Sequence, residues 1–224
     1  MKIRSLTMRL HFFVGSLVLF FSCKGLSAEN KLTNTPNSAI ETISIATISL
    51  DTNSTHVDSL VAAAIALTQD EVMYDGAYFS IPYPNGDVPK GLGVCTDVVI
   101  RAYRKLGIDL QKEVHEDMEA NFSLYPKNWG LKKTDTNIDH RRVPNLMTFF
   151  KRHGTEKLIT KNPNDYVPGD LVCWMLSGNL THIGIVVNQK STDGKRFLIV
   201  HNIGAGQVLA DCLFDFRIIG HYSY

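Results

Sequence analysis

The sequence predicts an α+β domain in which helices come first and an antiparallel sheet follows. Apolar residues recur at helical spacing from about residue 57 to residue 153. From Tyr166 onward the spacing changes to two, which is typical of strands with one buried face. Helices that precede strands, instead of alternating with them, favour an α+β architecture over parallel βαβ units.

Four segments are expected to be helical, namely 57–69, 95–106, 111–122 and 143–153. Asp58 or Ser59 is expected to cap the first helix, which is rich in Ala and Leu. Gly107 closes the second helix, and Pro144 occupies a favourable position in the first turn of the fourth. These signals define the helical half of the domain.

Four strands are expected after the helices, over 171–175, 181–188, 197–202 and 217–222. Gly178-Asn179 and Asp193-Gly194 are turn signals between them. Such short connections join antiparallel neighbours, so the strands are expected to form one antiparallel sheet.

Composition excludes several classes of protein. Of the 224 residues, 44% are hydrophobic and 20% are charged, which excludes collagen-like, coiled-coil and wholly disordered chains. The 23 Lys and Arg residues nearly balance the 22 Asp and Glu residues, giving a net charge of +1. Without a basic field, nucleic acid is not an expected partner.

The first residues are expected to direct export. Three basic residues precede an apolar run of about ten residues, too short for a membrane span, so 1–28 is interpreted as a secretory signal. Leu19–Cys23 resembles a bacterial lipobox, which would make Cys23 a lipidated membrane anchor. Leu26-Ser27-Ala28 is the alternative, an ordinary cleavage site. Either reading predicts a protein of the bacterial envelope, periplasmic or anchored as a lipoprotein.

Two further regions follow the signal. Residues 29–56 are rich in Ser, Thr and Asn and are expected to form a flexible tether. Residues 57–224 have the size of one domain with a substantial core.

Cys95 is the first candidate for chemistry because it begins a predicted helix. The free N–H groups and the dipole of a helix N-terminus favour thiolate over thiol. The backbone N–H of Cys95 is placed to contribute to an oxyanion hole. The alternative is a cysteine simply buried beside Val94.

His182 and His201 lie on neighbouring predicted strands. If residues 189–194 form the loop of a hairpin, His182 falls directly opposite His201, with Cβ atoms about 5 Å apart. His201 would then orient His182 through one ring nitrogen and leave the other facing Cys95. A tight turn at Asp193-Gly194 would instead place His201 opposite Val186, too far away. Structural roles for both histidines are the remaining alternative.

Several motifs carry a family resemblance. Pro168–Val172, followed by His182–Val186, resembles motifs of the NlpC-type papain-like cysteine peptidases of bacterial cell walls. Five further motifs occur in order along the domain: GVCTDVV at 93–99, HEDM at 115–118, IDHRRVPN at 138–145, THIG at 181–184 and HNIG at 201–204. Together they resemble the family called domain of unknown function 1287.

This resemblance implies a papain-like fold with Cys95 as nucleophile, His182 as general base and His201 as orienting residue. It implies a cysteine amidase or peptidase with a thioester intermediate and no metal or organic cofactor. The wider group mostly cleaves amide bonds of peptidoglycan stem peptides and also includes acyltransferases. Oligomeric state is not predicted.

Six further residues are candidates for substrate binding: Tyr83, Asp97, His115, Asp117, Arg141 and Arg142. The two arginines are suited to a stem-peptide carboxylate, which guanidinium groups bind in bidentate pairs. Alternatively, one of them pairs with Asp139 or Asp117. Tyr83 is expected beside the oxyanion, as a tyrosine is in NlpC-type relatives.

The other candidates have weaker support. Asp97 is interpreted either as a substrate-binding residue or as a helix cap or partner of an arginine. His115 and Asp117 are two residues apart, which separates their directions on a helix. Two alternatives are open for the remaining cysteines: Cys173 and Cys212 form a disulfide, or Cys173 is simply a core residue.

Three other classes of function remain open. A metal-dependent hydrolase would use His115, Asp117, Asp139, His140, His182 and His201, whose spacings match no compact ligand motif. A non-catalytic lipoprotein would use the same fold to bind peptides. An acyltransferase would form the same thioester but require an acceptor other than water.

Overall fold

The computed structural model describes residues 52–224, and its helices precede its main sheet along the chain. The α-helices are α1 (Thr52–Leu67), α2 (Cys95–Lys105), α3 (Leu110–Ala120) and α4 (Val143–His153). The predicted export signal, the lipidation site Cys23 and most of the predicted tether lie outside the described residues. Among residues 52–224, no helix has the length and apolar character needed to cross a membrane.

The main sheet has six strands in the order β3-β8-β4-β5-β6-β7, and every neighbouring pair is antiparallel. Its strands are β3 (Thr155–Glu156), β4 (Leu171–Met175), β5 (Thr181–Lys190), β6 (Phe197–His201), β7 (Val208–Ala210) and β8 (Arg217–Ser223). The four predicted strands are confirmed. The edge strands β3 and β7 were not predicted, because two or three residues show too little alternation to reveal a strand.

A second, two-stranded sheet precedes helix α2. Its strands β1 (Met73–Tyr74) and β2 (Leu92–Gly93) are parallel. Five short 3₁₀ turns connect the larger elements: Phe122–Leu124, Asn128–Gly130, Asp139–Arg141, Pro163–Asp165 and Ser177–Asn179. The turn Asp139–Arg141 lies against α2, α3 and α4.

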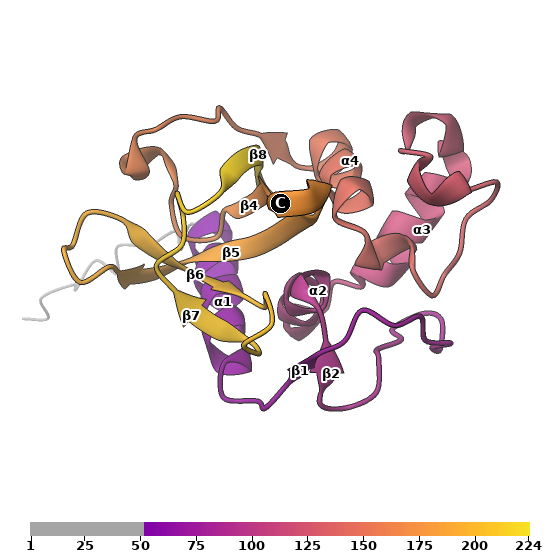
Figure 1. The fold of residues 1–224 in the computed structure, drawn as a ribbon, viewed down its shortest axis with the longest axis horizontal. Coiled ribbons are helices and arrows are strands. Elements are labelled where there is room, and N and C mark those ends of the chain that lie inside the picture. The colour runs from indigo at the N-terminus through magenta and orange to yellow at the C-terminus, as the bar shows by residue number, and fades with distance from the viewer. Residues whose placement is uncertain (1–51) are drawn as a thin grey trace, which may run out of the picture. The chain divides into compact units, whose positions relative to one another are not determined.

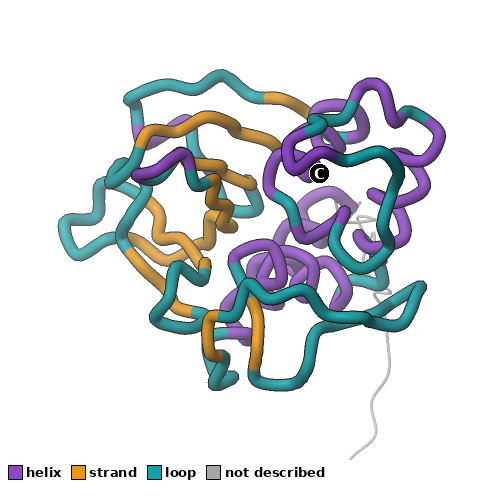
Figure 2. The backbone as a smooth tube through the Cα atoms, turned by 45° about the vertical axis from the view of Figure 1, so that its right-hand side comes forward, coloured by secondary structure: helices purple, strands orange, loops and turns teal. Residues whose placement is uncertain are grey.

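Each face of the main sheet carries its own apolar cluster. Cys173, Ile183 and Ile185 point into the larger cluster, together with buried side chains of α1, α2 and α4. Their sequence neighbours Val172 and Trp174 point the other way, into a smaller cluster beneath the loops. Figure 1 shows α1 behind the strands, with α2, α3 and α4 beside them, and Figure 2 shows the same separation of helices from strands. This confirms the predicted α+β architecture.

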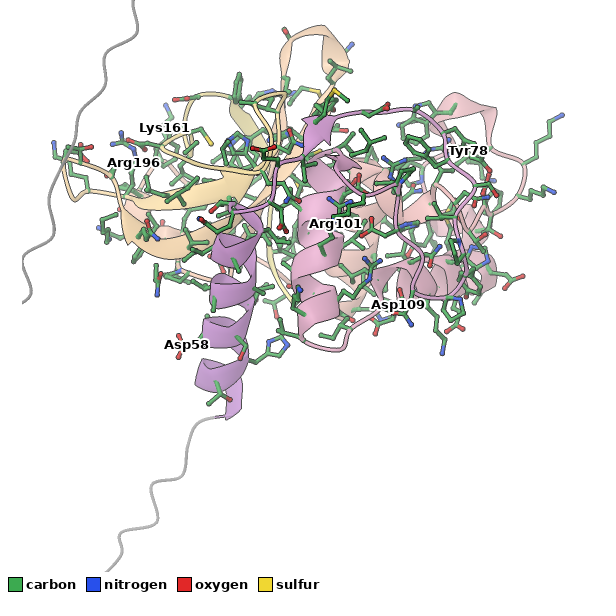
Figure 3. The ribbon with its side chains drawn as sticks, turned by 90° about the horizontal axis from the view of Figure 1, so that it is seen from below. Asp58, Tyr78, Arg101, Asp109, Lys161 and Arg196 are labelled. Carbon is green, nitrogen blue, oxygen red and sulfur yellow. The ribbon has the colours of Figure 1, made fainter. Side chains whose placement is uncertain are left out.

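One boundary differs from the prediction. Helix α1 begins at Thr52, so Asp58 and Ser59 lie inside it and cap nothing, and the end of the predicted tether is helical. Val57 packs against the large cluster and Leu60 belongs to it, so the helix is fixed to the core near its start. Figure 3 shows α1, with Asp58, running alongside α2, with Arg101.

Candidate active site

Helix α2 presents Cys95 as its first residue, directly after β2 and Val94. The Asp97 carboxylate, one turn in, accepts a hydrogen bond from the Val94 N–H at 2.7 Å and so fixes the start of the helix. A Cβ atom at Gly93 would lie 3.0 Å from a guanidinium nitrogen of Arg101. A side chain at Gly93 would therefore require the Arg101 guanidinium to shift.

The Cys95 thiol is buried, with 5% of the residue exposed. Burial raises the pKa of this thiol to about 11, although hydrogen bonding from the backbone of Ile183 and Thr96 acts in the opposite direction. The predicted preference for thiolate is therefore wrong for this state, because loss of hydration outweighs the helix N-terminus. Ile183 directly follows His182, so the thiol lies against the strand that carries this histidine.

His182 and His201 are joined by a hydrogen bond of 2.8 Å between Nε2 of His182 and Nδ1 of His201. Both residues are 3% exposed. Burial, reinforced by the neighbouring His201, lowers the pKa of His182 to about 3, and burial also lowers the pKa of His201. Both imidazoles are therefore neutral near pH 7, and Nδ1 of His182 is left as the ring nitrogen for a base.

The pairing of β5 with β6 differs from both predicted registers. Ile185 pairs with Val200 and Val186 with Ile199, and the register shifts between Val186 and Lys190. His201 consequently lies beside Gly184, diagonal to His182. The imidazoles meet across the diagonal because Gly184 has no side chain between them.

Gly184→Ala is expected to separate the two imidazoles. A Cβ atom at this position would lie 2.6 Å from Cγ2 of Ile199 and 3.1 Å from Cβ of His201. We expect a loss of about 1–3 kcal/mol in unfolding free energy from overpacking. Chemical denaturation would measure this loss, and ¹⁵N NMR of the histidine rings would report the broken hydrogen bond.

Gly76→Ala is the matched control, since a Cβ atom at Gly76 meets nothing within 4 Å. It should leave both measurements unchanged. Unaltered histidine signals in Gly184→Ala would contradict the role given to Gly184.

Arg141 and Asp97 form a buried, bidentate ion pair. The guanidinium Nε and Nη2 donate to the two carboxylate oxygens at 3.0 and 3.1 Å, and the two side chains are 2% and 4% exposed. Arg141 also donates to the carbonyls of Asp75 and Ala77, and its own carbonyl accepts from the Thr96 hydroxyl. The pair therefore ties the Asp139–Arg141 turn and the loop after β1 to the start of α2.

His115 and Asp117 contact separate partners. His115 contacts Asp139 through Nδ1 at 3.0 Å, whereas Asp117 forms two hydrogen bonds with Arg152 of α4. Hydrogen bonding from Arg152 holds the pKa of Asp117 well below its usual range. The two residues thus face different elements and do not form a joint site.

The structure places Tyr83 against the His115 ring, with centroids 5.3 Å apart. Tyr74, and not Tyr83, responds to Cys95. Burial is the main cause that raises the pKa of Tyr74, and the charge of Cys95 adds to this rise. Tyr74 pairs with Gly93 and is 46% exposed. Sequence reasoning missed Tyr74 because a two-residue parallel strand leaves no periodic signal.

Arg142 is the candidate cation that forms no ion pair with any described residue. Its guanidinium carbon lies 4.3 Å from the centroid of the Trp129 ring, which is 57% exposed. Nη1 of Arg142 is buried without a hydrogen-bond partner among the described residues. Burial lowers the pKa of Arg142, while Asp139 and Asp135 raise it.

Several buried polar atoms near Arg142 in the sequence have no hydrogen-bond partner. Of the five buried side-chain atoms that lack such a partner within residues 52–224, four belong to Asp139, His140, Arg142 and Asn145.

The three described cysteines, Cys95, Cys173 and Cys212, are free, so the possible Cys173–Cys212 disulfide is not formed. Cys173 points into the large cluster and Cys212 into the small one, on opposite faces of the sheet. Within the described part of the chain, no three His, Cys, Asp or Glu side chains form a group suited to a metal ion.

Two sequence comparisons identify relatives of the chain. The model of a family described as "Domain of unknown function (DUF1287)" matches residues 61–224. A protein of Escherichia coli (strain K12), "Uncharacterized protein YijF", is 54% identical over 153 residues, which cover 68% of this chain and 74% of that protein.

Two solved structures show distant similarity. An N-acetylmuramoyl-L-alanine amidase from Bacteroides uniformis is 12% identical, with a TM-score of 0.45 over 75% of this chain and 97% of that chain. NlpC1 from Trichomonas vaginalis is 13% identical, with a TM-score of 0.41 over 75% of this chain. The match spans 44% of the NlpC1 chain, less than half its length.

Proposed function

The chain belongs to the family described as domain of unknown function 1287, and from this premise we propose that it is a cysteine amidase acting on peptidoglycan stem peptides. The observation that carries the proposal is the buried hydrogen bond between His182 and His201 on the strand pair next to Cys95. A nucleophile at a helix start, a histidine base and a residue orienting that base form the general pattern of nucleophilic catalysis.

The neutral thiol and neutral imidazole define the first step. Once a substrate amide lies at Cys95, the thiol proton passes to Nδ1 of His182 and sulfur attacks the carbonyl carbon. The backbone N–H of Cys95, in the unpaired first turn of α2, donates to the resulting oxyanion.

The His182 imidazolium then protonates the amide nitrogen, the C–N bond breaks, and an amine leaves a thioester on Cys95. His182, neutral again, takes a proton from water, whose oxygen attacks the thioester carbon. Protonation of the Cys95 sulfur by His182 releases the carboxylic acid and restores the enzyme. No electron donor or acceptor enters this cycle.

Arg142 is proposed to bind a carboxylate of the stem peptide. Asp97 forms an ion pair with Arg141, whereas Arg142 forms no ion pair with any described residue and its guanidinium lies over the Trp129 ring. Hydrogen bonds to charged groups contribute about 1.5–3 kcal/mol. Arg142 directly follows Arg141, whose side chain pairs with Asp97 in the first turn of α2, so the proposal places the bound carboxylate on the side of the domain where α2 begins.

Arg142→Met is therefore expected to raise KM by about 10- to 100-fold with little change in kcat, because the carboxylate contact is made equally in the ground and transition states. Steady-state kinetics on a purified muropeptide would measure both constants. The KM of Arg142→Lys should lie between those of wild type and Arg142→Met, since lysine keeps the charge without the bidentate geometry. An unchanged KM in Arg142→Met would remove Arg142 from the substrate site.

Export and lipidation at Cys23 complete the proposal. The N-terminal pattern of basic residues, apolar run and lipobox-like segment supports both. A protein exported to the envelope reaches peptidoglycan, which lies outside the cytoplasm.

Mass spectrometry of muropeptides incubated with the purified full-length chain tests the function. Hydrolysis predicts fragments whose masses sum to the substrate plus one water, with and without a chelator. Fragments that appear only when an amine acceptor is added would instead identify an acyltransferase. Tight binding without any fragment would identify a peptide-binding protein and end the proposal of catalysis.

A further inference from the structure

The hydrogen bonds that start at His182 continue beyond His201 to a cysteine. Nε2 of His201 lies 3.7 Å from Sγ of Cys212, at the distance of a hydrogen bond to sulfur. We propose that Cys212 is a positioning residue, whose sulfur accepts a hydrogen bond from the Nε2–H of His201 and thereby fixes the tautomers of both histidines. This inference rests on the proposed roles of Cys95 and His182.

The loop that carries Cys212 is held in place by the sheet. Trp174 on β4 donates its indole N–H to the carbonyl of Leu213 at 2.9 Å, and Leu213 is the residue after Cys212. The Trp174 ring also lies 5.7 Å from the His182 ring, centroid to centroid. Cys212 is 8% exposed and Leu213 is fully buried. The sulfur therefore has a fixed position relative to both imidazoles.

Only one arrangement of protons suits the proposed base. If Nε2 of His201 carries its proton and donates to Cys212, then Nδ1 of His201 accepts from Nε2–H of His182. Nδ1 of His182 then has a lone pair available for the Cys95 thiol proton. The opposite arrangement places a proton on Nδ1 of His182, which cannot then act as a base.

The charges around this chain of hydrogen bonds are few. Burial raises the pKa of Cys212 to about 12, with Asp215 and Asp211 adding to the effect. Asp215 also acts on His201, raising a pKa that burial lowers. Asp211 is paired with Arg196. His182, on β5, is neutral near pH 7. Because the pKa of Cys212 is raised, Cys212 contacts His201 as an uncharged thiol.

A structural role alone would need only volume at this position. Cys212 lies among apolar side chains, including Tyr166, Val172 and Ile199, where an apolar residue of similar size would pack as well. The contact with His201 is the feature that an apolar residue cannot provide. Cys212→Val therefore keeps volume without the acceptor, and Cys212→Ser keeps a hydrogen-bonding atom at smaller volume.

Two measurements on the full-length chain test the proposal without any substrate. Ring ¹⁵N NMR identifies which nitrogen of each histidine carries the proton, and peptide mass spectrometry follows alkylation of Cys95 by iodoacetamide across a pH series. In wild type, we expect protonated Nε2 on both histidines. In Cys212→Val, we expect mixed tautomers and alkylation of Cys95 slowed at least about tenfold near neutral pH, with Cys212→Ser close to wild type.

The outcomes separate the two hypotheses. Wild-type tautomers and alkylation in Cys212→Val, or equal defects in the Val and Ser variants, would overturn the positioning role. Thermal melting identifies variants that fail to fold, and if Cys212→Val does, Cys212→Ser against Cys212→Ala, which lacks the acceptor, decides through the same two readouts. Absence of muropeptide cleavage by wild type would contradict the proposed function while leaving the tautomer measurement valid.

Discussion

Cys95→Ala is expected to abolish muropeptide cleavage, lowering kcat/KM by at least about a thousandfold. The covalent thioester cannot form without sulfur, and removing a nucleophile typically leaves only the weak acceleration given by binding and oxyanion contacts. The assay is the release of fragments from purified muropeptides. The fold should persist, because the change removes one buried atom from the start of a helix anchored by Asp97.

Cys173→Ala is the matched control, because Cys173 is buried in the same apolar cluster and has no place in the proposed mechanism. It should keep its kcat/KM within a few-fold of wild type. Equal loss of activity in both variants would show that cavity formation, and not loss of the nucleophile, is the cause.

The same cysteine carries a pH dependence. Because burial raises the pKa of Cys95 to about 11, alkylation through the thiolate should accelerate about tenfold per pH unit at alkaline pH. Near neutral pH, His182, with a pKa of about 3, stays neutral and takes the thiol proton as the sulfur is alkylated, so the alkylation rate should level off. A rate that keeps falling tenfold per pH unit below pH 7 would contradict the proposed base.

Arg141→Met is expected to lower the free energy of unfolding by about 3–5 kcal/mol. The change leaves the Asp97 carboxylate buried without its cation, and a buried unpaired charge is strongly destabilising. The carbonyls of Asp75 and Ala77 also lose their donor. Chemical denaturation measures the effect, and the start of α2 should be the first region to exchange its amide protons.

Two further variants serve as comparisons for Arg141→Met. Arg196→Met breaks the Arg196–Asp211 pair, whose side chains are 31% and 35% exposed, and should cost about 1 kcal/mol or less. Figure 3 shows Arg196 far along the molecule from Tyr78, whose loop Arg141 contacts. Asp97→Leu combined with Arg141→Met should recover part of the loss, because no charge is then left unpaired. A cost for Arg141→Met similar to that for Arg196→Met would contradict a structural role for the buried pair.

Most helices and strands could be predicted from the sequence because the signals that mark them are short-range. Pro144 in the first turn marks helix α4 at its observed bounds, and alternation marks β4 over Leu171–Met175. The start of α1 could not be predicted, because residues 52–56 show no apolar repeat and have weak helix propensity. The short strands β1 and β2 lacked any periodic signal, and with them Tyr74 was missed.

The candidate site, too, could be predicted from the sequence only in part. The sequence alone singled out Cys95, His182 and His201, because a helix start and two strand positions follow from local pattern and motif. Tertiary structure decided how they meet: the β5–β6 register places Gly184 opposite His201, and the imidazoles meet on the diagonal.

Tertiary structure also decided the environment of each group. Burial of Cys95 outweighs the helix N-terminus, Asp97 takes Arg141 and leaves Arg142 free, and the loop after β7 brings Cys212 to His201. Hydration, register and ion pairing depend on residues distant in sequence, whereas periodicity and capping depend on neighbours. The sequence by itself therefore determined the elements and the reactive residue types, and only the packed structure determined their pKa values and partners.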